Sequence, residues 1–147
     1  MNISEIKRKL IYDEGKRHRP YKCTAGKLTI GVGRNLEDVG ISEATIDQML
    51  SEDIEKCAVQ AKTIFKEKWD TFSDERKCGI INMIFNLGYF GFCQFKMMIS
   101  AINANDRAAI RAHGANSLWA RQVGERAQRV LSLIADEIDV YPNGAAQ

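Results

Sequence analysis

The chain has 147 residues, 45% of them hydrophobic, which is enough for one compact soluble domain and leaves room for two lobes that share its core. Its 21 basic and 19 acidic residues leave a formal net charge of +2, and this near balance argues against nucleic acid as the main partner. Four widely spaced cysteines and two distant histidines form no metal-binding pattern, so we expect no metal, no cofactor and reduced thiols.

Hydropathy gives no sign of export or membrane insertion. The first 15 residues, MNISEIKRKLIYDEG, contain no apolar run of signal-peptide length. No later segment approaches the roughly 20 apolar residues of a membrane span. We therefore expect no stable membrane insertion and no exit route of the protein's own.

The first predicted element is a short amphipathic helix from about residue 3 to residue 13. Asn2 followed by Glu5 is typical of a capping box at a helix start. Apolar residues then recur at helical spacing, namely Ile3, Ile6, Leu10 and Ile11. Glu14 is expected at the C-terminal end of this helix.

A small β region follows the first helix. Pro20 is expected to end helical structure, and residues 21–23 and 28–32 predict two strands. The turn Thr24–Lys27, which contains a glycine, would fold them into a hairpin. Residues 34–40, RNLEDVG, are expected to form a polar loop or a third short strand.

Three side chains of this region form the candidate active site: Glu14, Cys23 and Thr29. Eight residues separate Glu14 from Cys23 and five separate Cys23 from Thr29, so the hairpin would bring the last two together. Each residue also has an ordinary structural interpretation, as a solvated acid, a core thiol and a strand former. Their combination with the motifs below favours the catalytic interpretation.

The rest of the chain is predicted to be helical. Ser42 as an N-cap, and Ile41 with Ile46 as a hydrophobic staple, begin a helix of residues 42–66, about 37 Å long, which would connect two lobes. Further helices are predicted from Ser73 to Gly88 and over residues 95–102, 106–112 and 125–138, with breaks at Asn105, Gly114 and Gly124. Cys57 and Cys78 fall on apolar helical faces, where buried free thiols are expected. The fold class is therefore α+β, mainly α.

Four segments carry a resemblance to a known family: DEG at 13–15, PYKCTAGKLTIGVG at 20–33, NMIFNLG at 82–88 and SLWARQVGERAQRV at 117–130. In this order they resemble the phage-type lysozymes of glycoside hydrolase family 24, and the likeness extends from Leu10 to Leu131. The resemblance implies a muramidase that cleaves bacterial peptidoglycan between N-acetylmuramic acid and N-acetylglucosamine.

The resemblance also implies the organisation of a single lysozyme domain. Residues 12–41 would form the β-containing lobe and residues 42–66 the connecting helix. Residues 67–141, joined by the N-terminal helix 3–13, would form the helical lobe, with the substrate cleft between the lobes. Residues 142–147 would be a flexible tail.

Catalytic roles carry over from the family motifs residue by residue. Glu14 matches the general acid, and Thr29 matches the residue that helps to position the attacking water. Cys23 stands where the best-known members have Asp, although the family pattern also admits Cys. Arg126 matches an arginine expected to pair with the catalytic glutamate.

Substrate contacts carry over to four further positions: Asn35, Phe85, Met98 and His113. Trp119 and Gln122 match the family's SxWxxQ pattern as well. For Trp119 we favour a structural role under the last helix over sugar stacking.

The missing second carboxyl leaves the chemistry of Cys23 open. Glycoside hydrolysis ordinarily uses two carboxyl groups. A thiol with a pKa of about 8.5 is only a few per cent ionised at pH 7, and a nearby Glu14 carboxylate would lower that fraction. Three possibilities remain for Cys23. A cation such as Arg126 or Lys22 would stabilise its thiolate, or the thiol would act as a polarisable hydrogen-bond partner of the water, or the enzyme would work at alkaline pH. Inversion and retention both stay open.

The expected partner is peptidoglycan, and the expected state is a monomer. The family resemblance implies a phage endolysin that accumulates in the host cytoplasm, reaches the wall through a separate membrane-permeabilising protein and causes lysis. Two alternatives remain: a non-catalytic peptidoglycan-binding or structural relative, and a cationic protein that disrupts membranes through residues 127–138.

Overall fold

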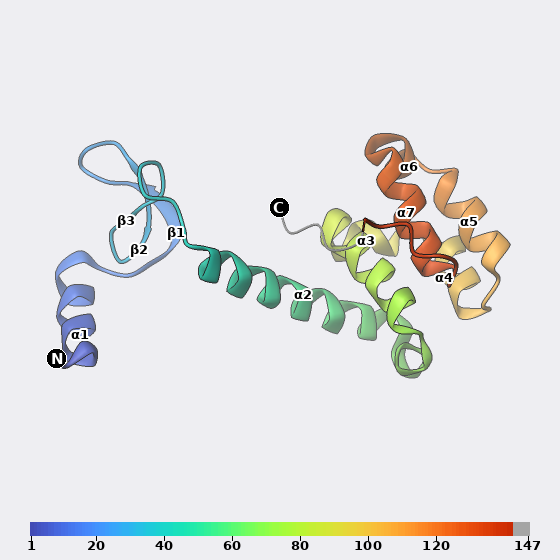
Figure 1. The fold of residues 1–147 in the computed structure, drawn as a ribbon, viewed down its shortest axis with the longest axis horizontal. Coiled ribbons are helices and arrows are strands. Elements are labelled where there is room, and N and C mark those ends of the chain that lie inside the picture. The colour runs from blue at the N-terminus through green and yellow to red at the C-terminus, as the bar shows by residue number, and fades with distance from the viewer. Residues whose placement is uncertain (143–147) are drawn as a thin grey trace. The chain divides into compact units, whose positions relative to one another are not determined.

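The computed structural model describes residues 1–142 and separates the chain into two compact units, Met1–Met49 and Leu50–Gln147. They are called here the N-terminal unit and the helical unit and are described one at a time. The elements, shown in Figure 1, are α1 (Ile3–Glu14), β1 (Arg17–Lys22), β2 (Leu28–Gly31), β3 (Arg34–Asn35), α2 (Glu43–Phe65), a 3-10 helix (Lys66–Thr71), α3 (Asp74–Cys93), α4 (Lys96–Asn103), α5 (Arg107–Ala115), α6 (Leu118–Val123) and α7 (Glu125–Ile134). The predicted α+β, mainly helical fold class is confirmed.

Helix α1 begins as predicted from its cap. The side chain of Asn2 accepts a hydrogen bond of 3.1 Å from the backbone N–H of Glu5. The helix ends at Gly15, whose φ of 77° and N–H bond to the carbonyl of Ile11 stop the chain directly after Glu14. No residue of α1 is buried, so its apolar stripe contributes no core to the N-terminal unit.

The three strands form one antiparallel sheet in the order β1-β2-β3. Thr29 of the central strand pairs with Tyr21 on one side and with Asn35 on the other. Both expectations for residues 34–40 are met in part: Arg34–Asn35 form the third short strand, and the residues after them form turns. Pro20 lies inside β1 rather than before it, because β1 is an edge strand with a register shift between Arg17 and Tyr21, where a residue without an N–H is tolerated.

Helix α2 confirms the prediction for residues 42–66. The hydroxyl of Ser42 accepts a bond of 3.2 Å from the N–H of Thr45, and the helix continues to Phe65. Its buried residues all lie in its second half: Cys57, Ala61 and Phe65.

The predicted assignment of segments to two lobes, and of the N-terminal helix to the helical lobe, stays a prediction.

The helical unit holds the hydrophobic core. α3 and α7 are packed closely, and a Cβ at Gly79 of α3 would lie 2.7 Å from the Ile134 side chain, so only glycine fits there. The largest fully buried side chains are Phe92, Ile80, Met83, Ile84, Met98, Ile102, Ile110, Leu131, Ile134 and Val130. This unit therefore has its own apolar core, built from helices α2 to α7.

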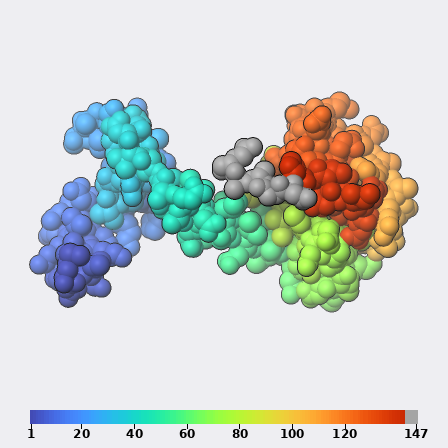
Figure 2. Space-filling view, viewed as in Figure 1, coloured from blue at the N-terminus to red at the C-terminus, as the bar shows by residue number. Residues whose placement is uncertain are grey.

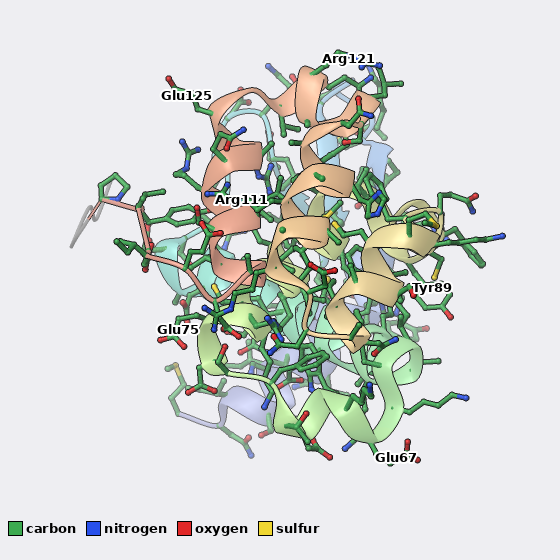
Figure 3. All side chains as sticks on the ribbon, turned by 90° about the vertical axis from the view of Figure 1, so that its right-hand side faces the viewer. Glu67, Glu75, Tyr89, Arg111, Arg121 and Glu125 are labelled. Carbon is green, nitrogen blue, oxygen red and sulfur yellow. The ribbon has the colours of Figure 1, made fainter. Side chains whose placement is uncertain are left out.

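A buried arginine joins the start of α3 to the end of α7. Arg76, only 4% exposed, donates 2.6 Å to the carbonyl of Ile134 and 2.9 Å to Asn105, and its guanidinium lies 3.0 Å from the carboxylate of Asp136. Ser73, the N-cap of α3, also donates to Asp136. Nearby, Arg111 of α5 (labelled in Figure 3) donates to Glu137 at 2.7 Å. Hydrogen bonds and ion pairs thus fix the segment after α7 to the neighbouring helices, in addition to the apolar packing.

Several boundaries in the helical unit differ from prediction. Helical structure breaks at Gly88 as expected, with φ 77°, but the chain resumes a helix as far as Cys93. Gly114 is not a break: it lies buried inside α5, where a Cβ would overlap Leu131. Helix α6, capped by Ser117, was not predicted.

The end of the last helix and one of the cysteines also differ from prediction. α7 ends at Ile134 rather than at residue 138, because Ala135 caps it and Asp136 takes a positive φ of 53°. All four cysteines are free, as expected, and Cys57 is buried, but the prediction of a buried Cys78 is wrong because that residue is exposed. The predicted flexible tail lies outside the described residues from residue 143 onward.

No single helix within residues 1–142 has both the length and the apolarity of a membrane span. α3 and α4 taken together meet the two criteria by length and composition alone, with a bend of 108° between them.

Candidate active site

Glu14 is the last residue of α1 and presents an exposed carboxylate. Its side chain lies against the loop after β2: a Cβ placed on Gly33 would be 3.3 Å from Glu14 Oε2. Gly33 has a φ of 68°, a conformation that favours glycine. The glycine therefore serves two needs at once, the turn and the close approach of the carboxylate.

Cys23 lies directly after β1, at the entrance of the hairpin turn. Its N–H donates to the carbonyl of Lys27 at 3.0 Å, and its carbonyl accepts from the N–H of Gly26 at 2.8 Å, which closes a tight turn. The same turn contains the backbone N–H groups of Ala25 and Lys27, which act on the sulfur.

Hydrogen bonds to the sulfur hold the pKa of the Cys23 thiol below its usual value. The backbone N–H of Lys27 is the largest cause, followed by that of Ala25; desolvation opposes them, and the Thr29 hydroxyl adds a smaller lowering. Neutral backbone donors that favour the thiolate are thus a further possibility beside the three that the sequence leaves open for Cys23.

Thr29 is the one buried residue of the N-terminal unit, with 3% of its surface exposed. Its hydroxyl donates to the carbonyl of Lys27 at 2.8 Å and also reaches the sulfur of Cys23. The hairpin brings Cys23 and Thr29 together, as their spacing predicted. The hydroxyl has one hydrogen, so it can donate to a thiolate only when it releases the carbonyl of Lys27, whereas it can accept from the protonated thiol while that bond is kept.

Asn35 lies on β3 beside Thr29, and its amide closes the next turn. Its Nδ2 donates to Asp38 at 3.0 Å, and its Oδ1 accepts from the N–H of Asp38 at 3.0 Å. Both ends of the amide are thus occupied within the loop. Its predicted contact with substrate stays a prediction.

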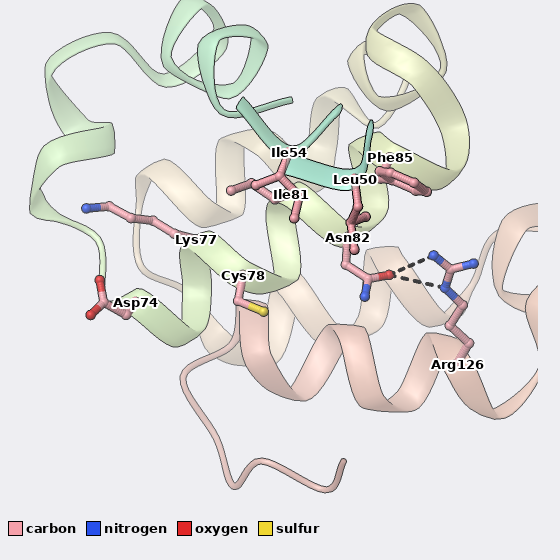
Figure 4. A pocket seen from close by; sticks show the side chains of 9 residues that line it. All are labelled: Leu50, Ile54, Asp74, Lys77, Cys78, Ile81, Asn82, Phe85 and Arg126. Carbon is pink, nitrogen blue, oxygen red and sulfur yellow. Dashed lines mark hydrogen bonds between the residues drawn. The ribbon is translucent and has the colours of Figure 1, made fainter. Parts of the chain in front are cut away.

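Arg126 and Phe85 belong to the helical unit and line one pocket there. Arg126 of α7 donates through Nε and Nη2 to Asn82 Oδ1 of α3, at 3.1 and 2.9 Å (Figure 4). Phe85, 48% exposed, forms another part of the wall. The pocket measures about 510 Å³ and is lined by Leu50, Ile54, Asp74, Lys77, Cys78, Ile81, Asn82, Phe85 and Arg126. The predicted pairing of Arg126 with Glu14 stays a prediction.

Comparison with known families decides what these residues belong to. A family model described as phage lysozyme matches residues 12–134, which include Glu14, Cys23, Thr29 and Arg126. The chain belongs to the phage lysozyme family.

Three relatives illustrate the range of this phage lysozyme family. The chain is 28% identical to probable T4-type lysozyme 1 of Dictyostelium discoideum, over 90% of this chain and 94% of that one, and 26% identical to probable T4-type lysozyme 2 of the same organism, over 89% and 94%. It is also 27% identical to the pre-baseplate central spike protein Gp5 of Enterobacteria phage T4, over 91% of this chain but 28% of the spike protein.

Two other predicted substrate contacts of this lysozyme-family chain line a second pocket. Met98 of α4 is buried in the core, whereas His113 of α5 is exposed. The two side chains nevertheless share a pocket of about 400 Å³, together with Gln94, Phe95, Lys96, Met97, Asn116 and Ser117. The structure therefore brings Met98 and His113 together, and their contact with substrate stays a prediction.

Trp119 has the structural environment that the sequence favoured. It is 3% exposed, donates from Nε1 to Asn86 at 2.8 Å and meets Phe95 edge to face at 6.3 Å. Gln122, which matched the same pattern, is exposed.

Sequence reasoning missed the groups that bind the predicted site residues. From the sequence, Asn82, which holds Arg126, is assigned only to the apolar segment around Phe85, although an amide within such a segment is itself a signal of a buried hydrogen bond. The backbone donors of Ala25 and Lys27 carry no signal in the side-chain sequence. No group of His, Cys, Asp or Glu within the described part of the chain is arranged to hold a metal ion.

Proposed function

We propose that this member of the phage lysozyme family is an active muramidase that hydrolyses the β-1,4 bond between N-acetylmuramic acid and N-acetylglucosamine in peptidoglycan. The observation that carries the proposal is the local structure of the hairpin. Cys23 replaces the expected carboxyl, and the turn supplies N–H donors that lower the pKa of its thiol. A thiolate then stands in for the second carboxylate of a glycosidase.

In the proposed reaction Glu14 gives its proton to the glycosidic oxygen as the bond from that oxygen to the sugar C1 breaks. A water held by Thr29 adds its oxygen to C1 and passes a proton to the Cys23 thiolate. If the sulfur instead attacks C1 first, water later releases the sugar from it. The anomer of the first product separates the two courses, because direct attack by water inverts C1 and two successive displacements retain it.

Three variants assayed on purified cell walls test this proposal, with products identified by mass spectrometry. We expect Glu14→Gln to lose at least about 100-fold in rate, because it cannot donate the proton. Cys23→Asp should remain active, since it restores a carboxylate, whereas Cys23→Ala should lose most activity. Full activity of Glu14→Gln would sink the assignment, and full activity of Cys23→Ala would show that the thiol is a bystander.

The same assay decides between the proposal and a non-catalytic relative. Wall binding by the native protein without any cleaved product would favour a peptidoglycan-binding role. Lysis that persists in Glu14→Gln without sugar products would favour membrane disruption.

Deployment is a separate proposal. We propose that the protein accumulates in the host cytoplasm and reaches the wall after a second protein permeabilises the membrane. Two relatives are named as lysozymes and match along nearly their whole length, which supports a free enzyme. Fractionation of infected cells tests this: recovery with assembled particles would instead favour a structural setting like that of the phage spike protein.

A further inference from the structure

The basic residues of this nearly balanced chain are not spread evenly. Between Gly15 and Leu36 the sequence contains six of the 21 basic residues and none of the 19 acidic ones. The remainder of the chain therefore has 15 basic and 19 acidic residues. The one markedly cationic segment is the segment that joins Glu14 to Cys23 and Thr29.

Four of these six cations lie on one exposed edge strand or directly before it. Lys16 immediately precedes β1, and the strand contains Arg17, Arg19 and Lys22, all exposed. β1 pairs only with β2, so its other edge has no strand partner within the described residues. Figure 2 shows the surface of this unit in blue and cyan.

These cations are not neutralised by carboxylates of the fold. The ion pairs recorded within residues 1–142 include none of Lys16, Arg17, Arg19 and Lys22, whereas Lys27 on the neighbouring turn pairs with Asp38 at 3.3 Å. Arg17 instead stacks over the ring of Tyr21 at 4.7 Å, which leaves its charge without an acidic partner. The strand thus presents several positive charges that an anionic ligand would neutralise.

We propose that β1, with Lys16, is a binding strand for the carboxylates of the peptide stems that branch from the glycan. This inference rests on the proposed function, since it places the anions on the same polymer that the enzyme cleaves. An extended strand rises about 3.3 Å per residue, so Arg17 and Lys22 are roughly 17 Å apart along the chain. Cations spread over that length can contact several carboxylates of a branched polymer at once.

Position in the chain favours the substrate over another anion as the ligand. β1 begins three residues after Glu14 and ends one residue before Cys23, so a polymer bound along it is held next to both. A simpler role also exists, because lysine, arginine and proline on an edge strand prevent pairing with a second copy. Replacing the cations of β1 by neutral residues distinguishes the two roles. If the strand binds substrate, wall binding is lost; if the strand only prevents pairing, the protein self-associates.

The experiment compares two triple variants of equal charge. The test variant is Lys16→Gln with Arg17→Gln and Arg19→Gln, and the control is Lys62→Gln with Lys66→Gln and Arg121→Gln, three exposed cations of the helical unit (Arg121 is labelled in Figure 3). Each lowers the formal net charge from +2 to −1, so a general effect of charge is matched. A third variant, Arg17→Lys with Arg19→Lys, keeps the charge of the strand.

Binding is measured by sedimentation with purified cell walls on ice. The salt concentration is varied from about 20 to about 500 mM, the range over which salt screens interactions between exposed charges. Walls with carboxyls amidated by carbodiimide, and vesicles of phosphatidylglycerol, serve as comparison probes. We expect the test variant to bind native walls about tenfold more weakly at low salt. This difference should disappear at high salt and on amidated walls, and the control and the Arg-to-Lys variant should stay within about twofold of the native protein.

Equal binding of the test and control variants would overturn the inference. So would self-association of the test variant with unchanged wall binding, which would leave only edge protection. Native protein that binds vesicles as tightly as walls, with the same loss in the test variant, would assign the strand to anionic lipid instead. Cleavage is scored separately: salt-dependent wall binding without cleavage overturns the muramidase proposal alone, and cleavage with unchanged binding of the test variant overturns this inference alone.

Discussion

The N-terminal unit and the helical unit are stabilised in different ways. In the first 49 residues Thr29 is the only buried residue, and order comes from caps, strand pairing and tight turns. The helical unit instead buries an apolar cluster built from six helices and a buried arginine network. Fewer than about 50 residues seldom supply a sufficient core of their own. The candidate catalytic residues Glu14, Cys23 and Thr29 therefore lie in the unit with the smaller apolar contribution.

The largest expected effect comes from removing core volume in the helical unit. Phe92→Ala, at a residue with 0% exposure, should lower the free energy of unfolding by about 3 to 5 kcal/mol because it leaves a cavity. Phe90→Ala, two positions earlier on α3 and 79% exposed, is the matched control and should change it by less than about 0.5 kcal/mol. Urea denaturation followed by circular dichroism measures both. Equal effects of the two would refute a core placed at Phe92.

The next effect comes from the buried arginine. Arg76→Met removes bonds to Ile134, Asn105 and Asp136 and leaves a carboxylate without its partner, so we expect a loss of about 2 to 4 kcal/mol. Arg121→Met, at an exposed position of α6, serves as the control. The same denaturation experiment applies, and an unchanged midpoint for Arg76→Met would show that the network adds nothing to stability.

A smaller effect is expected from removing one helix cap in each unit, and it tests whether the two units unfold separately. Asn2 caps α1 and Asp106 caps α5, through bonds of 3.1 and 3.0 Å to backbone N–H groups. Replacing either by Ala should cost about 1 kcal/mol locally. If the N-terminal unit opens on its own, Asn2→Ala will speed hydrogen exchange in α1 and leave the main unfolding midpoint unchanged, while Asp106→Ala will lower that midpoint. Matching shifts from both variants would show one cooperative unit.

The smallest change concerns ionisation, with no mutation needed. Backbone N–H bonds lower the pKa of the Cys23 thiol. Cys78 is exposed but lines the pocket beside Phe85, and partial desolvation there, then the Asp139 and Glu75 carboxylates, raise the pKa of its thiol. Since the thiolate is the reactive form, alkylation of Cys23 should rise at a lower pH than alkylation of Cys78. Iodoacetamide labelling across pH, read peptide by peptide by mass spectrometry, measures both. The reverse order would contradict the hydrogen-bonded sulfur at the turn.

The same titration bears on the proposed reaction. A lowered thiol pKa means that the thiolate, and with it the activity, is retained to a lower pH than an unperturbed cysteine would allow. In Cys23→Asp the acidic limb should move further down, because a carboxyl ionises below a thiol. An identical pH profile for the two proteins would exclude the thiolate from the reaction.

Elements set by local pattern were predicted from the sequence. α1 and α2 follow from helical periodicity and from the caps Asn2 and Ser42, and the hairpin follows from two strands around a glycine turn. The prediction that Cys23 and Thr29 lie close together depended only on this hairpin.

Features set by tertiary packing were not predictable in that way. Gly114 looked like a helix break because glycine has low helix propensity, yet the close packing of Leu131 requires a residue without a side chain inside α5. Helix α6 has six residues, too few for a periodic signal, and depends on its cap at Ser117. The lowered pKa of Cys23 could not be predicted either, since backbone donors leave no trace in residue identity.

The packing of Gly114 against Leu131 couples the sizes of the side chains that the two positions can hold. The isobutyl group of Leu131 fills the space where a side chain at Gly114 would stand. A larger residue at 114 is therefore tolerable only beside a smaller one at 131, and each single exchange should be selected against alone. Aligned members of the phage lysozyme family should accordingly show the two positions varying as a pair, with the summed side-chain volume nearly constant.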